Sequence, residues 1–226
     1  DKMENEFLKS KIASGLFWKF SERVLAQFVS FIVSIVLARI LLPEQYGIVS
    51  IVLIFISFAD VFVTSGFSAA LIQKKDANDT DFSTIFYCSL FASLIAYAIL
   101  YLIAPLIAKF YNMYDLTIVI RVFSFKLIIS SYNAIQHAYV SRHMVFKRFF
   151  FSTLIGTIIS GFVGIVLAYK GFGVWALIAQ YLSNTCIDSI VLSFTIPWHP
   201  KCEFSYKSAK ELIKFGTKVL VADFSR

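Results

Sequence analysis

The stretch GIVSIVLIFISFADVFVTSGFSAALI, residues 47–72, contains a single charged side chain, Asp60. A helix of about 20 apolar residues crosses the hydrocarbon core of a bilayer, and in lipid only helices and closed barrels satisfy their own backbone hydrogen bonds. This stretch is therefore predicted to be a transmembrane helix.

Apolar stretches of similar length recur along the whole chain. They lie at about residues 16–41, 47–72, 83–108, 116–140, 149–169 and 174–196, and a further one begins near Ala209. Short polar connections separate them, and the ~10-residue alternating segments of membrane β-barrels are absent. We expect an all-α membrane protein with six transmembrane helices in residues 1–196, a cytoplasmic linker at 197–208 and the start of a seventh helix at 209–226.

The composition excludes most soluble classes of protein. Of the 226 residues, 58% are apolar or aromatic and 15% are charged, whereas soluble domains have about 45–50% and ~25%. Sequence signatures of ATP, zinc-protease and serine-hydrolase sites are absent. Asp79-Thr80-Asp81 matches a glycosyltransferase DxD motif, but the short loop around it favours helix capping. The three histidines and three cysteines are scattered, so no catalytic residue, metal or cofactor is predicted.

The basic residues predict the orientation of the chain. Short cytoplasmic loops of membrane proteins are enriched in Lys and Arg. Twelve such residues lie in the N-terminal tail and alternate connections, and three lie in the opposite set. The first set is Lys2, Lys9, Lys11, Lys74, Lys75, Arg142, Lys147, Arg148, Lys201, Lys207, Lys210 and Lys214, and the second is Arg39, Lys109 and Lys170. This asymmetry predicts a cytoplasmic N-terminus and explains the net charge of +7 without a nucleic-acid partner.

Polar side chains interrupt four of the predicted spans at helical spacing. A charge in the hydrocarbon core costs on the order of 3 kcal/mol or more, so each needs a partner, a wet cavity or a function. At 100° per residue, the members of each stripe fall within an arc of about 80°. The stripes are Lys19, Arg23, Gln27, Ser30 and Ser34; Ser50, Ser57, Asp60, Thr64 and Ser68; Lys126, Ser130, Asn133, His137 and Ser141; and Gln180, Asn184 and Asp188.

Two interpretations of these stripes stay open. In one, they join helices to each other, with Lys19 and Arg23 reaching the membrane surface and Asp60 paired or protonated. In the other, which their number favours, they converge on a hydrated cavity. The candidate substrate-binding residues are then Lys19, Arg23, Gln27, Lys126, Asn133, His137, Gln180 and Asn184, and the candidate ion-coupling residues are Asp60 and Asp188. The span at 149–169 differs, because its small residues recur every fourth position and predict a packing face: Ser152, Gly156, Ser160, Gly164 and Ala168.

Five short segments carry a resemblance to a known family. They are residues 38–47 (ARILLPEQYG), 66–73 (GFSAALIQ), 144–147 (MVFK), 173–177 (GVWAL) and 212–216 (LIKFG). In their order and spacing the chain resembles the polysaccharide flippases, the O-antigen and exopolysaccharide transporters of the multidrug/oligosaccharidyl-lipid/polysaccharide exporter superfamily. The resemblance runs the length of the chain.

The resemblance implies a transporter rather than an enzyme, located in the bacterial inner membrane. Its substrate would be an undecaprenyl-pyrophosphate-linked oligosaccharide, moved from the cytoplasmic to the periplasmic leaflet, and its other contacts would be membrane lipid and other polysaccharide-assembly proteins. The implied fold has two pseudo-symmetric helical lobes, of which this chain corresponds to the first. The hypothesis that follows gives the pyrophosphate to Lys19 and Arg23 and the driving cation to Asp60 and Asp188.

Three alternatives remain. A cation-coupled drug antiporter of the same superfamily would share the topology, although its site should avoid fixed positive charge such as Lys19 and Arg23. A membrane-embedded polysaccharide polymerase would need a large catalytic loop, and every connection is short. A structural membrane subunit would leave the polar stripes unexplained.

Overall fold

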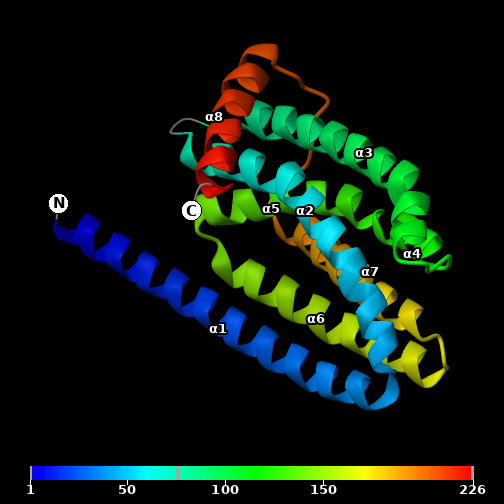
Figure 1. The fold of residues 1–226 in the computed structure, drawn as a ribbon. Helices are drawn as coiled ribbons and strands as arrows, with labels where there is room; N and C mark the ends of the chain where they lie inside the picture. The colour runs from blue at the N-terminus through cyan, green and yellow to red at the C-terminus, as the bar shows by residue number, and fades with distance from the viewer. Residues whose placement is uncertain (1, 75–76, 225–226) are drawn as a thin grey trace.

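The computed structural model describes residues 2–74 and 77–224 (Figure 1), and within them it contains helices and connecting loops but no strand. The side chains of residues 2–14, 16, 65, 215 and 218–224 are not described, so nothing is described of the side chains of the predicted inner-side cations Lys2, Lys9 and Lys11, and Lys75 lies outside the described residues. The all-helical fold class is confirmed. The helices are α1 (Lys2–Ile40), α2 (Pro43–Gln73), α3 (Asp79–Phe110), α4 (Leu116–Phe123), α5 (Lys126–His143), α6 (Phe146–Tyr169), α7 (Val174–Thr195) and α8 (Tyr206–Phe224).

Five segments of the described chain are long and apolar enough to cross a membrane. They are Phe17–Ile40, Pro43–Gln73, Asp79–Phe110, Leu116–His143 and Phe146–Tyr169. Helix α7 occupies the range of the sixth predicted span but is not among them, because its polar side chains lower its mean hydropathy. Helix α8 occupies the range of the seventh. The count of six spans and a seventh therefore stays a prediction.

The span predicted at 116–140 lies within one candidate span, Leu116–His143, which the structure divides into the two helices α4 and α5. At the break, Ser124 Oγ donates to the carbonyl of Ile120 over 2.6 Å. The backbone N–H groups of Phe125 and Leu127 bond to carbonyls three residues earlier rather than four. Such side-chain competition and 3₁₀-type bonding tighten a helix locally and turn its axis.

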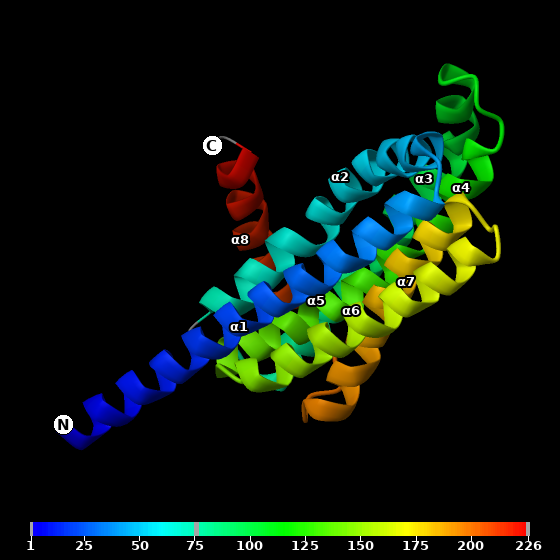
Figure 2. The same cartoon turned by 90° about the horizontal axis from the view of Figure 1, so that it is seen from below.

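The helices pack in two groups. Helix α6 lies between α1 and α7, while α2 contacts α3, α5 and α8. Figure 2 shows the start of α1 extending past the other helices, and α8 standing on the far side of α2 from α1. One buried core joins α1, α2, α4 and α7 through residues such as Leu37, Val52 and Ile120. The other joins α2, α3, α5 and α7 through Leu71, Ile135 and Leu192.

The small-residue face predicted on residues 149–169 is confirmed as a packing face. Ser152, Gly156, Ser160, Gly164 and Ala168 are all buried. A Cβ at Gly156 would lie 3.2 Å from Asn184 Oδ1, and one at Gly164 would lie 3.0 Å from Gln180 Cβ. The ridge therefore sets the approach of α6 to the polar face of α7.

Two of the resemblance segments meet where α8 crosses α2. A Cβ built on Gly216 would lie 2.6 Å from the carbonyl oxygen of Gly66. No side chain can be added there unless the helices move apart, since backbone atoms cannot swing away. The glycines of these two segments are thus explained by a close backbone crossing.

The segment between α7 and α8 is held against the first turn of α3. Backbone N–H groups of Lys201 and Ser205 donate to Ser83 Oγ and Thr84 Oγ1 over 3.1 and 3.0 Å. Lys201 Nζ bonds to Asp79 over 3.0 Å, and this carboxylate raises the pKa of the Lys201 ammonium. Asp79-Thr80-Asp81 begins the helix, with Asn78 and Asp81 forming a reciprocal capping box, as the capping interpretation predicts.

Candidate functional site

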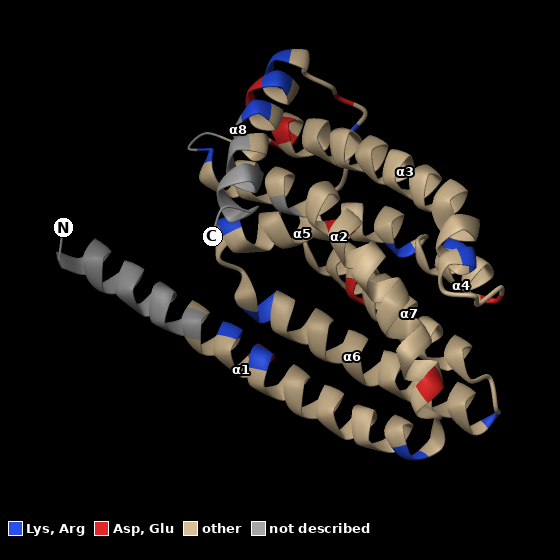
Figure 3. Ribbon diagram, viewed as in Figure 1, with Lys and Arg blue, Asp and Glu red and all other residues tan. Residues whose placement is uncertain are grey.

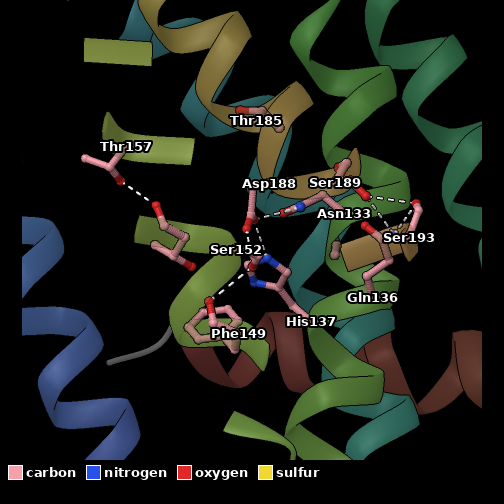
Figure 4. A network of polar contacts seen from close by, with 12 residues as sticks. Asn133, Gln136, His137, Phe149, Ser152, Thr157, Thr185, Asp188, Ser189 and Ser193 are labelled. Carbon is pink, nitrogen blue, oxygen red and sulfur yellow. Dashed lines mark hydrogen bonds and ion pairs between the residues drawn. The ribbon is translucent and has the colours of Figure 1, made fainter. Parts of the chain in front are cut away.

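The buried carboxylate of Asp188 is the centre of a polar network between three helices (Figure 4). Its Oδ2 accepts from Asn133 Nδ2 over 2.9 Å and lies 2.8 Å from His137 Nε2, both on α5. Its Oδ1 accepts from Ser152 Oγ on α6 over 2.7 Å. A carboxylate inside an apolar bundle is tolerated when such donors surround it. Three helices are therefore joined at one residue of α7.

A second set of hydrogen bonds adjoins this network and joins α5 to α7. Gln136 Nε2 on α5 donates to the backbone carbonyl of Ser189 over 3.1 Å and to Ser193 Oγ over 2.8 Å. Tyr132 OH lies 2.9 Å from the same Ser193 hydroxyl. Contact between α5 and α7 is thus polar along several turns, on the face that also holds Asn133.

An open hollow of about 340 Å³ lies between α2 and α5, next to the Asp188 network. Helices α2 and α5 run in the same direction, since Ser68 bonds to the Ala134 carbonyl and Arg142 bonds to the Leu71 carbonyl. Asn133 and His137 contribute to the hollow while also bonding to Asp188, and 35% of the His137 side chain is exposed. The lining is Thr64, Ser68, Ile72, Ser130, Asn133, Ala134, His137, Ala138 and Ser141.

Gln180 and Asn184 lie in a different cavity, of about 180 Å³, between α1, α2, α6 and α7. Ser30 and Ser34 of the first polar stripe line it together with Tyr46, whose buried hydroxyl has no hydrogen-bond partner in the described part of the chain. Asn184 Oδ1 is 3.5 Å from Ser160 Oγ. The cavity is polar but uncharged.

The basic end of the α1 stripe faces outward beside α6. The Lys19 ammonium lies 5.6 Å from the centre of the Phe146 ring, and the Lys147 ammonium lies 5.6 Å from the centre of the Trp18 ring. Arg23 and Gln27 line an open hollow of about 520 Å³ along the exposed apolar face of α1. Figure 3 shows this group of cations where α1 passes the beginning of α6.

Asp60 lies within α2, and Lys126 is the first residue of α5. One carboxylate oxygen of Asp60 is buried without a hydrogen-bond partner among the described residues. No ion pair joins Asp60 to Lys126 in the part of the chain the structure describes.

The structure thus groups the predicted residues around three hollows rather than one. It joins Asn133 and His137 to Asp188, places Gln180 with Asn184, and leaves Lys19, Arg23 and Gln27 together on α1. It also adds Ser152, which the sequence assigns only to a packing face, because a serine among glycines and alanines at four-residue spacing gives no sign of a carboxylate opposite it.

Comparison with known proteins identifies the family. The model of a family described as "Polysaccharide biosynthesis protein" matches residues 36–226. The teichuronic acid biosynthesis protein TuaB of Bacillus subtilis is 27% identical over 70% of this chain and 33% of its own length. The succinoglycan biosynthesis transport protein ExoT of Rhizobium meliloti is 22% identical over 80% of this chain and 37% of its own.

The lipopolysaccharide biosynthesis protein WzxC of Escherichia coli is 22% identical over 92% of this chain and 43% of its own length. No solved structure matches. The chain spans between 33% and 43% of the length of these curated relatives. Its apolar helices and these relatives indicate a multi-pass bacterial membrane protein. The chain belongs to the polysaccharide biosynthesis protein family.

Proposed function

We propose that this chain forms the first lobe of a flippase that turns an undecaprenyl-pyrophosphate-linked oligosaccharide from the cytoplasmic to the periplasmic leaflet of the inner membrane. In this proposal six helices span the membrane, with α7 as the sixth, and the N-terminus is cytoplasmic. The name of ExoT, a transport protein, supports a transporter rather than an enzyme, and that of WzxC, a lipopolysaccharide biosynthesis protein, supports a role in polysaccharide biosynthesis.

The observation that carries the proposal is the Asp188 network beside the α2–α5 hollow. Purely structural contacts between membrane helices are met by small residues and single hydrogen bonds. Here a buried carboxylate takes three donors, and two of the donor residues also line an open hollow that has no Lys, Arg, Asp or Glu in its lining. Intramembrane ionisable residues with this placement are typical of substrate pathways.

In this proposal Lys19 and Arg23 take the pyrophosphate. They stand one turn apart on α1, and neither forms an ion pair in the described part of the chain. Cations that form no direct ion pair suit a diphosphate, although the Glu22 carboxylate on the same helix interacts with both. Ring contact with Phe146 orients the Lys19 ammonium without neutralising it.

The ion-coupling residues we propose are Asp60 and Asp188. Asp60 is the sharper candidate, because it has an unpartnered buried oxygen, whereas both oxygens of Asp188 are already occupied. Transport should lose part of its dependence on pH or sodium in the Asp60→Asn variant of the full-length protein. If transport by this variant kept its full dependence on both pH and sodium, Asp60 would not be an ion-coupling residue.

Complementation of a strain lacking its flippase tests the function. Arg23→Ala in the full-length gene is expected to lower surface polysaccharide severalfold at equal expression and to raise the lipid-linked repeat, whereas the control Arg39→Ala, at the other end of α1, should be near normal. Normal output from Arg23→Ala would exclude its role in binding pyrophosphate.

The side on which the repeat accumulates separates the alternatives. Loss of a flippase leaves the repeat in the inner leaflet, protected from an external reagent that modifies sugars. Loss of a polymerase leaves single repeats exposed outside. A drug antiporter would not affect the repeat at all, so each alternative has its own signature in the same strain.

A further inference from the structure

The Asp188 carboxylate decides which atoms of its α5 partners remain for other ligands. An ionised carboxylate only accepts hydrogen bonds, so both partners must turn a donor toward it. Asn133 therefore uses its Nδ2 and His137 uses its Nε2. The atoms left over are Asn133 Oδ1 and His137 Nδ1, and neither makes a hydrogen bond within the described residues. Asp188 thus leaves Asn133 Oδ1 as an acceptor beside the α2–α5 hollow, and His137 Nδ1 as an acceptor in a neutral imidazole or a donor in an imidazolium.

The remaining polar groups of the hollow are hydroxyls. Thr64 and Ser68 donate to the carbonyls of Asp60 and Ala134, so their oxygens remain acceptors. The hydroxyls of Ser130 and Ser141 bond to no group in the described part of the chain, and can both donate and accept. No Lys, Arg, Asp or Glu is among the lining residues described above. The polar surface of the hollow therefore consists of an amide oxygen, an imidazole nitrogen and hydroxyl groups.

We propose that the α2–α5 hollow is a subsite for a sugar ring, and that Asp188 is the positioning residue that prepares it. This rests on the proposed function, which supplies the oligosaccharide. Sugar hydroxyls donate as well as accept, so they satisfy Asn133 Oδ1, His137 Nδ1 and the serine hydroxyls together. The side chains of Ile72, Ala134 and Ala138 provide apolar surface for the C–H face of a sugar ring. The volume of the hollow, about 340 Å³, lies in the range of small-molecule sites.

The same chemistry disfavours phosphate in the hollow. At neutral pH a pyrophosphate offers mainly acceptor oxygens and several negative charges, which would meet Asn133 Oδ1 and the Thr64 and Ser68 oxygens with no Lys or Arg among the lining residues. The cations Lys19 and Arg23 lie instead on α1, where Lys19 contacts the Phe146 ring and Arg23 lines a different hollow. The two parts of the substrate therefore bind at separate places, the sugar between α2 and α5 and the diphosphate at α1.

Separate binding of the two parts tests this division. The full-length protein in lipid nanodiscs is dialysed to equilibrium against either of two radiolabelled probes. One is the free oligosaccharide released by mild acid from the strain's own lipid-linked repeat, and the other is inorganic pyrophosphate. The double variant Ser130→Ala/Ser141→Ala is expected to raise the Kd for oligosaccharide roughly tenfold, as for two lost hydrogen bonds, and to leave the Kd for pyrophosphate within about twofold.

Matched variants identify the cause of any change. Lys19→Ala/Arg23→Ala should give the opposite pattern, and Thr185→Ala, whose hydroxyl bonds only to the Tyr181 carbonyl, should change neither Kd. Asp188→Asn should weaken oligosaccharide binding more than pyrophosphate binding in the same sample. If Asp188 had a purely structural role, Asp188→Asn would weaken the binding of both probes equally.

Three results would overturn the inference: no oligosaccharide binding by the unmodified protein, an unchanged oligosaccharide Kd in the serine double variant, or an equal loss of both probes. The proposed function fails differently, because a strain lacking the gene would then accumulate no lipid-linked repeat. A strain that does accumulate it, together with an unchanged oligosaccharide Kd, would leave the flippase intact and exclude only this sugar subsite.

Discussion

At the scale of single residues, Asp188 should matter to stability as well as to binding. Asp188→Ala removes the acceptor for Asn133, His137 and Ser152. The donors of Asn133 and His137 then lose their partner, whereas Ser152 keeps the Phe149 carbonyl. Breaking such a buried charged network costs on the order of 3 kcal/mol, so the midpoint of thermal unfolding of the purified full-length protein should fall by several degrees. Thr185→Ala on the same helix should change it by a degree or less.

An unfolding midpoint for Asp188→Ala equal to that of the unaltered protein would show that water or other groups replace the carboxylate.

The opposite prediction holds at Gly47. It lies inside α2 with no atom within 4 Å of an added Cβ, and glycine in a helix interior is less stable than alanine by roughly 0.5–1 kcal/mol. Gly47→Ala should therefore leave stability unchanged or raise it.

The sequence predicts part of this site. Helical periodicity places Asn133 with His137 on one face and Gln180, Asn184 and Asp188 on another. It does not place the two faces at the same depth, since relative depth follows from loop geometry and from the approach of α6 to α7. For this reason the pairing of Asp188 with α5, and the part played by Ser152, could not be derived from spacing.

At the scale of whole helices, the crossing of α2 and α8 makes Gly216 the most restrictive position. Gly216→Ala would press a methyl group against the Gly66 carbonyl, so the helices must separate and lose the apolar contacts around them. We expect a destabilisation of about 1–3 kcal/mol, seen as a lower unfolding midpoint, with Gly47→Ala as the matched control. An unchanged midpoint would mean that this crossing is not close in the membrane.

Helix positions were largely predictable, and the break between α4 and α5 was not. Long apolar runs with polar connections leave little freedom in where a membrane helix starts and ends. Ser124 and Phe125, by contrast, stand within an apolar run without proline or glycine. The turn there depends on a serine hydroxyl bonding to its own backbone, which serines in unbroken helices also do.

At the scale of the whole molecule, the distribution of basic residues makes the topology testable. Alkaline phosphatase fused after Tyr114 or Gly171 should be active, because these loops are predicted to face the periplasm. Fusions after Met144 or His199 should be inactive. The His199 fusion decides the sixth span: activity there, with the other three as expected, would show that α7 does not cross the membrane.

The segment between α7 and α8, which is held against α3, bears on how the proposed first lobe can be expressed by itself. Trp198 is 3% exposed and packs against Phe82 and Tyr139, while Lys201 and Ser205 bond to the first turn of α3. A fragment ending at residue 196 would uncover that aromatic surface and leave the serine and threonine hydroxyls of α3 without their partners. Expression of the first lobe alone should therefore retain residues 197–205, and an affinity tag belongs beyond them rather than within.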